Sequence, residues 1–97
     1  MSTLLAAHVT FFYDESRFLY LAETVRHLKD AGTDVFVHTN RDFTRDFMSG
    51  AHLMCHELNG VHPYFLTRFS RFEMEKQLAA NKYGYYMYIE DDIAFGP

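Results

Sequence analysis

The chain has 97 residues and a formal net charge of -4, and 48% of its residues are hydrophobic. This length fits one domain, and the hydrophobic content lies well above that of chains that stay disordered. The acidic balance and the scattered Lys and Arg residues argue against binding to nucleic acid or to an anionic membrane surface.

Cysteine content and the amino-terminal segment bear on the compartment. The single cysteine, Cys55, cannot form an internal disulfide, so folding does not require an oxidising compartment. The start, Met1–Val9, lacks a basic region and is interrupted by His8, so it matches neither a signal peptide nor a spanning helix. We therefore expect a cytoplasmic protein with no membrane span.

The first part of the chain predicts a strand, a helix and a second strand. Leu4–Phe12 is nearly continuously apolar, which is typical of a strand buried on both faces of a parallel sheet. Apolar residues then recur at steps of three and four over Phe18–Leu28, which predicts an amphipathic helix that Gly32 ends. The β-branched and aromatic run Thr33–Thr39 predicts the next strand. Such a unit is right-handed, so we expect an α/β fold with a Rossmann-like open, mainly parallel sheet and flanking helices.

The second part predicts two more strands and one helix. Polar residues over Asn40–Gly50 indicate a loop with a helical turn, and Ala51–Leu58 is the third predicted strand. A helix is expected over Thr67–Lys82, and Tyr85–Ile89 is the last predicted strand. The residues expected to face the core from this part are Met74, Leu78 and Ala79 of the helix and the aromatic cluster Phe65, Phe69, Phe72, Tyr83, Tyr85, Tyr86 and Tyr88.

Three consecutive acids follow the last predicted strand. Because side chains alternate along an extended backbone, Glu90 and Asp92 can point to one side while Asp91 points to the other. Ligands of open parallel sheets bind outside the carboxyl ends of the strands. Carboxylates at such an end, together with a diphosphate, are the usual ligands of Mn2+ or Mg2+. The metal would bridge protein and phosphate and stabilise charge on a departing diphosphate.

The stretch Tyr85-Tyr86-Met87-Tyr88-Ile89-Glu90-Asp91-Asp92-Ile93 resembles the Glu-Asp-Asp variant of the DXD motif of GT-A fold glycosyltransferases. The preceding alternation of strands and a helix is similar to the first half of that fold. The resemblance implies a nucleoside-diphosphate sugar donor and bound Mn2+ or Mg2+. It makes Asp92 the principal metal ligand, with Glu90 also at the metal and Asp91 contacting the metal, ribose or base.

The same resemblance implies where the rest of the donor would lie. The end of the first strand, Thr10, Phe11, Phe12 and Tyr13, and the end of the second, Asn40, would border the nucleoside.

Arg68 and Arg71 lie three residues apart on the second predicted helix and could both face the diphosphate, and Arg71 is assigned to donor binding. The alternative is that both are solvated at the surface beside Glu75.

A complete GT-A domain needs roughly twice this length, and its second half normally supplies the acceptor pocket and any catalytic base. We therefore expect residues 1–97 to form a single nucleotide-sugar-binding subdomain of a larger glycosyltransferase, with no catalytic residue assigned and no turnover by this chain alone.

A second reading is a non-enzymatic α/β interaction module in which the three acids form only a solvated strand end. Apolar surface left on a truncated sheet would favour a homo-oligomer under either reading. His52 and His56 flank Cys55, but the extended segment predicted there favours structural or surface histidines over a zinc site. The other histidines, His8, His27, His38 and His62, show no ligand spacing.

Overall fold

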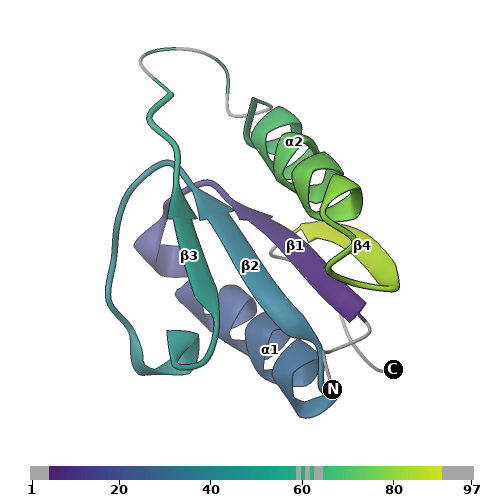
Figure 1. The fold of residues 1–97 in the computed structure, drawn as a ribbon. Coiled ribbons are helices and arrows are strands. Elements are labelled where there is room, and N and C mark those ends of the chain that lie inside the picture. The colour runs from purple at the N-terminus through teal and green to yellow at the C-terminus, as the bar shows by residue number, and fades with distance from the viewer. Residues whose placement is uncertain (1–4, 59, 61, 63–64, 91–97) are drawn as a thin grey trace.

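The computed structural model describes residues 5–58, 60, 62 and 65–90. Its elements are β1 (Leu5–Phe11), α1 (Phe18–Asp30), β2 (Asp34–Thr39), β3 (His52–Cys55), α2 (Phe65–Ala79) and β4 (Tyr85–Glu90), with short 3-10 turns at Glu15–Arg17 and Asp46–Met48. All four strands are parallel and lie in the order β3-β2-β1-β4. Helix α1 covers one face of the sheet and α2 the other (Figure 1). The predicted α/β class and Rossmann-like parallel sheet are confirmed.

The predicted elements differ from the observed ones mainly at their ends. The third strand covers His52–Cys55 and is shorter than the predicted Ala51–Leu58, because β2, its ladder partner in the described part of the sheet, ends at Thr39, opposite Cys55. Helix α2 begins two residues before Thr67 and ends at Ala79 rather than Lys82. The predicted helical turn in the loop after β2 is confirmed.

The face of the sheet under α1 is the hydrophobic core. Alternate residues of β1 and β2 point to this face, and α1 contributes its apolar stripe. The fully or almost fully buried members are Ala7, Val9, Phe11, Leu21, Val25, Leu28, Val35 and Val37. Gly32, with φ +79°, ends α1 in the predicted left-handed conformation.

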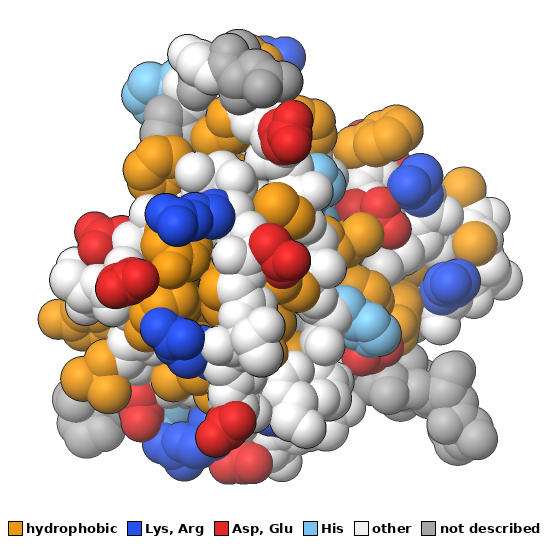
Figure 2. All heavy atoms as spheres, turned by 90° about the vertical axis from the view of Figure 1, so that its left-hand side faces the viewer, with side chains coloured by type: hydrophobic (Ala, Val, Ile, Leu, Met, Phe, Trp, Pro, Cys, Tyr) orange, Lys and Arg blue, Asp and Glu red, His pale blue; other side chains and the backbone are white. Residues whose placement is uncertain are grey.

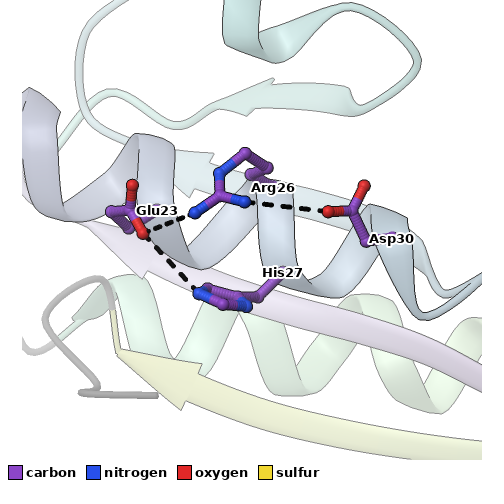
Figure 3. Close-up of polar contacts among 4 residues, drawn as sticks. All are labelled: Glu23, Arg26, His27 and Asp30. Atoms are coloured by element: carbon purple, nitrogen blue, oxygen red, sulfur yellow. Dashed lines mark hydrogen bonds and ion pairs between the residues drawn. The ribbon is translucent and has the colours of Figure 1, made fainter. Parts of the chain in front are cut away.

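The solvent-facing side of α1 carries charged residues one helical turn apart (Figure 3). The Arg26 guanidinium lies 2.8 Å from the Glu23 carboxylate and 3.8 Å from that of Asp30, and the His27 ring lies 3.6 Å from Glu23. These side chains are largely exposed, so each pair contributes only a few tenths of a kcal/mol. The stability of α1 therefore comes from its buried face.

The loop between β2 and β3 is fastened to α1. The Lys29 ammonium donates hydrogen bonds to the carbonyl oxygens of Phe47 and Ser49, at 3.0 and 2.7 Å. Phe43 and Phe47 add their rings to that of Phe18 at the start of α1. The polar loop predicted after the second strand is therefore held by aromatic packing.

Helix α2 buries a polar stripe, contrary to the prediction. Its buried residues are Leu66, Ser70 and Gln77, whereas Leu78 is 62% exposed and Ala79 is exposed. The expectation that Leu78 and Ala79 face the core was wrong because the strand face beneath α2 is itself polar: it presents His8, Thr10 and His38.

The aromatic cluster is only partly buried, so its assignment to the core was also wrong in part. Phe72 and Tyr85 are 60% and 69% exposed, and Phe65 and Tyr88 are exposed to lesser degrees. For Tyr85 and Tyr88 the reason is topological, because β4 lies at the edge of the described sheet with β1 as its neighbouring strand, whereas Phe65 and Phe72 are exposed residues of α2.

The charged side chains of the face seen in Figure 2 are mixed in sign, with no gathering of Lys and Arg into one basic patch. This agrees with the scattered basic residues of the sequence. Among the described helices, neither is both long and apolar enough to cross a lipid bilayer.

Candidate functional site

Predicted donor residues lie at the carboxyl-terminal ends of the parallel strands, which we call the carboxyl edge of the sheet. Glu90 is in register with Thr10 of β1, and Thr10 is in register with His38 of β2. Partners in register point to the same face, so these three belong to one row on the face covered by α2. This row lies at the carboxyl ends of the strands, where parallel sheets bind ligands.

Tyr13 and Asn40, from the ends of the first two strands, are in direct contact. The backbone N–H of Tyr13 donates a 2.7 Å hydrogen bond to Oδ1 of Asn40. Phe12 is 48% exposed, whereas the Phe11 side chain is completely buried in the core. Phe12 is therefore able to stack on a ligand, while Phe11 could touch one only through its backbone.

Arg41 belongs to the same edge and was missed by the sequence reasoning. Its guanidinium lies 4.7 Å from the centre of the Tyr13 ring, within the usual range of a cation–π contact. Asn40 directly precedes it and contacts the Tyr13 backbone. A basic residue two positions after the predicted strand end at Thr39 was the available signal. This position brings a permanent positive charge close to the predicted nucleoside contacts.

Three hydroxyl groups tie the end of β4 to its neighbours. The Tyr88 hydroxyl lies 3.1 Å from Thr10 Oγ1 on β1 and 3.0 Å from Thr67 Oγ1 in the first turn of α2. Glu90 follows Tyr88 by two residues and is exposed. These contacts hold the strand end that presents the Glu90 carboxylate.

The predicted metal site lies partly outside the described residues. Glu90 is the last residue of β4, while Asp91 and Asp92 fall beyond the described part. Within residues 5–58, 60, 62 and 65–90 no group of three or more His, Cys, Asp or Glu side chains is arranged to hold a metal ion. The exposed Glu90 carboxylate is the one predicted metal ligand that the structure places, and an oxygen ligand suits Mn2+ and Mg2+.

Arg71 lies in a groove between α2 and β4. The groove has a volume of about 450 Å³ and is lined by Thr67, Arg71, Met74, Glu75, Leu78, Tyr86 and Tyr88. A smaller hollow beside it shares Arg71 and adds Arg68, whose guanidinium lies over the Phe65 ring. The groove reaches the carboxyl edge at Thr67 and Tyr88, two residues before Glu90.

A chain of buried hydrogen bonds crosses the sheet beneath α2. His8 Nε2 lies 2.9 Å from Gln77 Oε1, and His8 Nδ1 lies 2.9 Å from His38 Nε2. His38 Nδ1 lies 3.0 Å from His56 Nε2. The His56 ring stacks on that of Phe69, with centroids 4.6 Å apart. The chain thus links α2 to the carboxyl edge, where the His56 backbone N–H donates to Thr39 O.

Burial governs the protonation of these imidazoles. It lowers the pKa of His38 to about 3, and the neighbouring His8 and His56 act in the same direction. Burial also lowers the pKa of His8 and of His56, although the Glu73 carboxylate partly opposes this, as does the Gln77 hydrogen bond at His8. All three rings are therefore neutral at pH 7.

This hydrogen-bond chain was not predicted from the sequence because the three histidines lie in different elements. The available signal was their placement: in a parallel sheet, His8 and His38 lie on the same face in neighbouring rows, and His56 follows one strand further on. The structural reading of His56 is consistent with its place in the network.

Comparison of the chain with models of protein families, with curated proteins and with solved structures finds no match. The class of protein is therefore defined by the structure: an open α/β sheet of four parallel strands flanked by helices, with polar residues converging at its carboxyl edge.

Proposed function

We propose that this chain is the donor-binding part of a GT-A-type glycosyltransferase, which binds a nucleoside-diphosphate sugar through Mn2+ or Mg2+ at Glu90 and Asp92. One observation carries the proposal: parallel β1, β2 and β4 end at one edge, so that Glu90, Thr10 and the contacting pair Tyr13 and Asn40 gather there. This is the position at which open α/β sheets bind nucleotides.

The metal would be held by the carboxylates of Glu90 and Asp92, with phosphate oxygens completing its coordination. Glu90 suits this role because it is exposed and forms no ion pair with another described residue. When bound, the ion supplies Lewis-acid stabilisation of the leaving diphosphate. The hydroxyl contacts of Tyr88 hold the strand end from which Glu90 projects.

The nucleoside would lie against the ends of β1 and β2. Phe12 offers an exposed aromatic ring for stacking. Asn40 Oδ1 accepts the hydrogen bond of the Tyr13 backbone N–H, which fixes its side chain between the two strand ends. Arg41 and Arg71 supply positive charge for the phosphates, from the loop after β2 and from α2 respectively.

Calorimetric titration with nucleoside diphosphates, in the presence and absence of Mn2+, tests the proposal. We expect at least one nucleoside diphosphate to bind only when Mn2+ is present. Glu90→Gln or Asp92→Asn should weaken this binding about tenfold or more, which corresponds to about 1.4 kcal/mol. Asp30→Asn is the matched control, since it removes the same charge at the far end of α1. No metal-dependent binding to any diphosphate would contradict the proposal.

The chain alone is expected to bind the donor without transferring sugar. Purified chain incubated with donor and a panel of acceptors should yield no glycosylated product by mass spectrometry. Transfer would show that residues 1–97 already contain a complete active site and would overturn the assignment of a donor-binding part.

The second candidate function is an interaction module, and the open groove between α2 and β4 favours it. Leu78 lines the groove and is largely exposed, and Tyr85 is exposed on the adjacent edge strand. Light scattering should then detect a homo-oligomer, and Asp92→Asn should leave both its mass and all binding properties unchanged. A loss of Mn2+ affinity in that variant would favour the transferase.

A further inference from the structure

The buried chain that links Gln77, His8, His38 and His56 has a direction. We propose that this chain fixes the tautomer of His56 and presents the lone pair of its Nδ1 as a proton acceptor at the carboxyl edge of the sheet. The proposed donor site does not require Nδ1 of His56. The hydrogen-bond chain is built from residues of β1, β2, α2 and the segment after β3.

The direction follows from the chemistry of each partner. The Gln77 Oε1 atom can only accept, so Nε2 of His8 must carry the hydrogen. A neutral imidazole has one N–H, so Nδ1 of His8 is bare and accepts from Nε2–H of His38. The same step repeats between His38 and His56. It leaves the Nδ1 of His56 unprotonated.

The hydrogen bonds run in this direction when all three rings are neutral, and their surroundings provide that condition. His8 and His38 are completely buried between the sheet and α2. The charged group that faces them from α2 is Glu73, whose carboxylate also interacts with Lys76. Asp34 lies at the far side of the sheet face, where it contacts His52 and the Tyr83 hydroxyl. A proton would therefore enter at the half-buried His56 rather than in the interior.

Packing against aromatic rings holds the hydrogen-bonded histidines in place. Phe36 stacks on His8 with centroids 4.9 Å apart and an angle of 9° between planes, and Phe69 stacks on His56 at 4.6 Å and 7°. The ring planes of His38 and His56 are parallel to within 9°. Stacking on Phe69 keeps the plane of the His56 ring, and a half-turn of the ring in that plane would lose the hydrogen bond to His38.

The position of His56 indicates the chemical class of its ligand. His56 follows β3 at the same edge as Asn40, and its backbone N–H bonds the last residue of β2. A bare imidazole nitrogen accepts a hydrogen bond, or a proton, from a hydroxyl group. That this hydroxyl belongs to a sugar or ribose rests on the proposed function, whereas the fixed acceptor itself does not.

Long-range proton–nitrogen NMR of the 15N-labelled full chain tests the tautomers at pH 7.5. We expect all three histidines to carry hydrogen on Nε2, with Nδ1 of His56 bare. Gln77→Met should leave the protein folded but His56 mixed between tautomers, whereas Leu78→Met, at the neighbouring exposed position, should preserve the wild-type pattern. Hydrogen on Nδ1 of His56, or averaging of the two tautomers in the wild-type chain, would overturn the inference.

A second measurement separates this inference from the donor-site proposal. His56→Phe keeps a ring against Phe69 but removes the acceptor. With UDP-glucose and Mn2+ as the probe, we expect about tenfold weaker binding in this variant and a shifted His56 nitrogen resonance in the wild type. Unchanged affinity and resonance would overturn the ligand role of His56. If no nucleoside-diphosphate sugar binds while the tautomers are as expected, the donor site fails and the fixed acceptor stands.

Discussion

The two faces of the sheet differ in the chemistry that holds a helix against them. The α1 face is packed mainly with aliphatic and aromatic side chains, and Thr24 is the buried polar residue that α1 adds to them. The α2 face buries three polar side chains of the strands, His8, Thr10 and His38, against Ser70 and Gln77. Apolar burial stabilises without specifying direction, whereas a buried polar network must be satisfied group by group. The α1 face therefore provides stability, and the α2 face fixes the orientation of groups at the carboxyl edge.

The largest expected effect is on the apolar face. Leu21→Ala removes a completely buried side chain of α1 and should lower the free energy of unfolding by about 2–5 kcal/mol, through lost burial and a cavity. Leu19→Ala is the control on the same helix, because Leu19 is 74% exposed, and should change stability by less than about 0.5 kcal/mol. Urea unfolding followed by circular dichroism measures both. Equal effects would contradict the assignment of the core to this face.

The second prediction breaks the polar face at its centre. His38→Leu leaves Nδ1 of the completely buried His8 without a partner, which costs about 1–3 kcal/mol, and the half-buried His56 also loses the acceptor of its Nε2–H. Adding His8→Leu should cost less than the sum of the two single changes, because residues of one network are not additive. A double-mutant cycle from urea unfolding decides this, and strict additivity would show that the rings do not act as one network.

Sequence patterns predicted the apolar face well, and for a physical reason. The near-continuous apolar run of the first strand and the three- and four-residue repeat of α1 are local signals of burial. The carboxyl ends of the first, second and last strands followed from the same signals to within one residue. The carboxyl edge that collects Thr10, Tyr13, Asn40 and Glu90 was therefore predictable once the strands were taken as parallel.

The polar face was not predictable in the same way. Its contacts join residues up to 78 positions apart, as between Thr10 and Tyr88, and the sequence alone does not distinguish a buried histidine from an exposed one. The helix stripe of α2 was therefore assigned to Leu78 instead of Gln77. The tie between Tyr88 and Thr67 depends on how α2 lies across β4, which no local pattern encodes.

The third prediction concerns how the free energy of unfolding changes as the pH falls. Folded His8, His38 and His56 have lowered pKa values, so the unfolded chain binds more protons once the pH falls below about 6.5. The free energy of unfolding should therefore fall with pH, by up to about 1.4 kcal/mol per unit for His38 alone. For His38 this window extends down to its folded pKa of about 3. Urea midpoints between pH 7.5 and 5 measure the slope, and His38→Leu should flatten it. A slope unchanged in that variant would contradict the buried neutral ring.

The smallest expected change in stability comes from a single hydroxyl group on the polar face. Ser70 Oγ is buried and has no hydrogen-bond partner in the described part of the chain. Ser70→Ala removes a hydroxyl that gave up its hydration without compensation, so it should be neutral or stabilise by up to about 1 kcal/mol. Thr10→Val is the matched control, because Thr10 Oγ1 contacts the Tyr88 hydroxyl, and it should destabilise by about 1 kcal/mol. If thermal unfolding shows Ser70→Ala to be as harmful as Thr10→Val, the Ser70 hydroxyl belongs to the network, and the polar face has no unsatisfied group at this position.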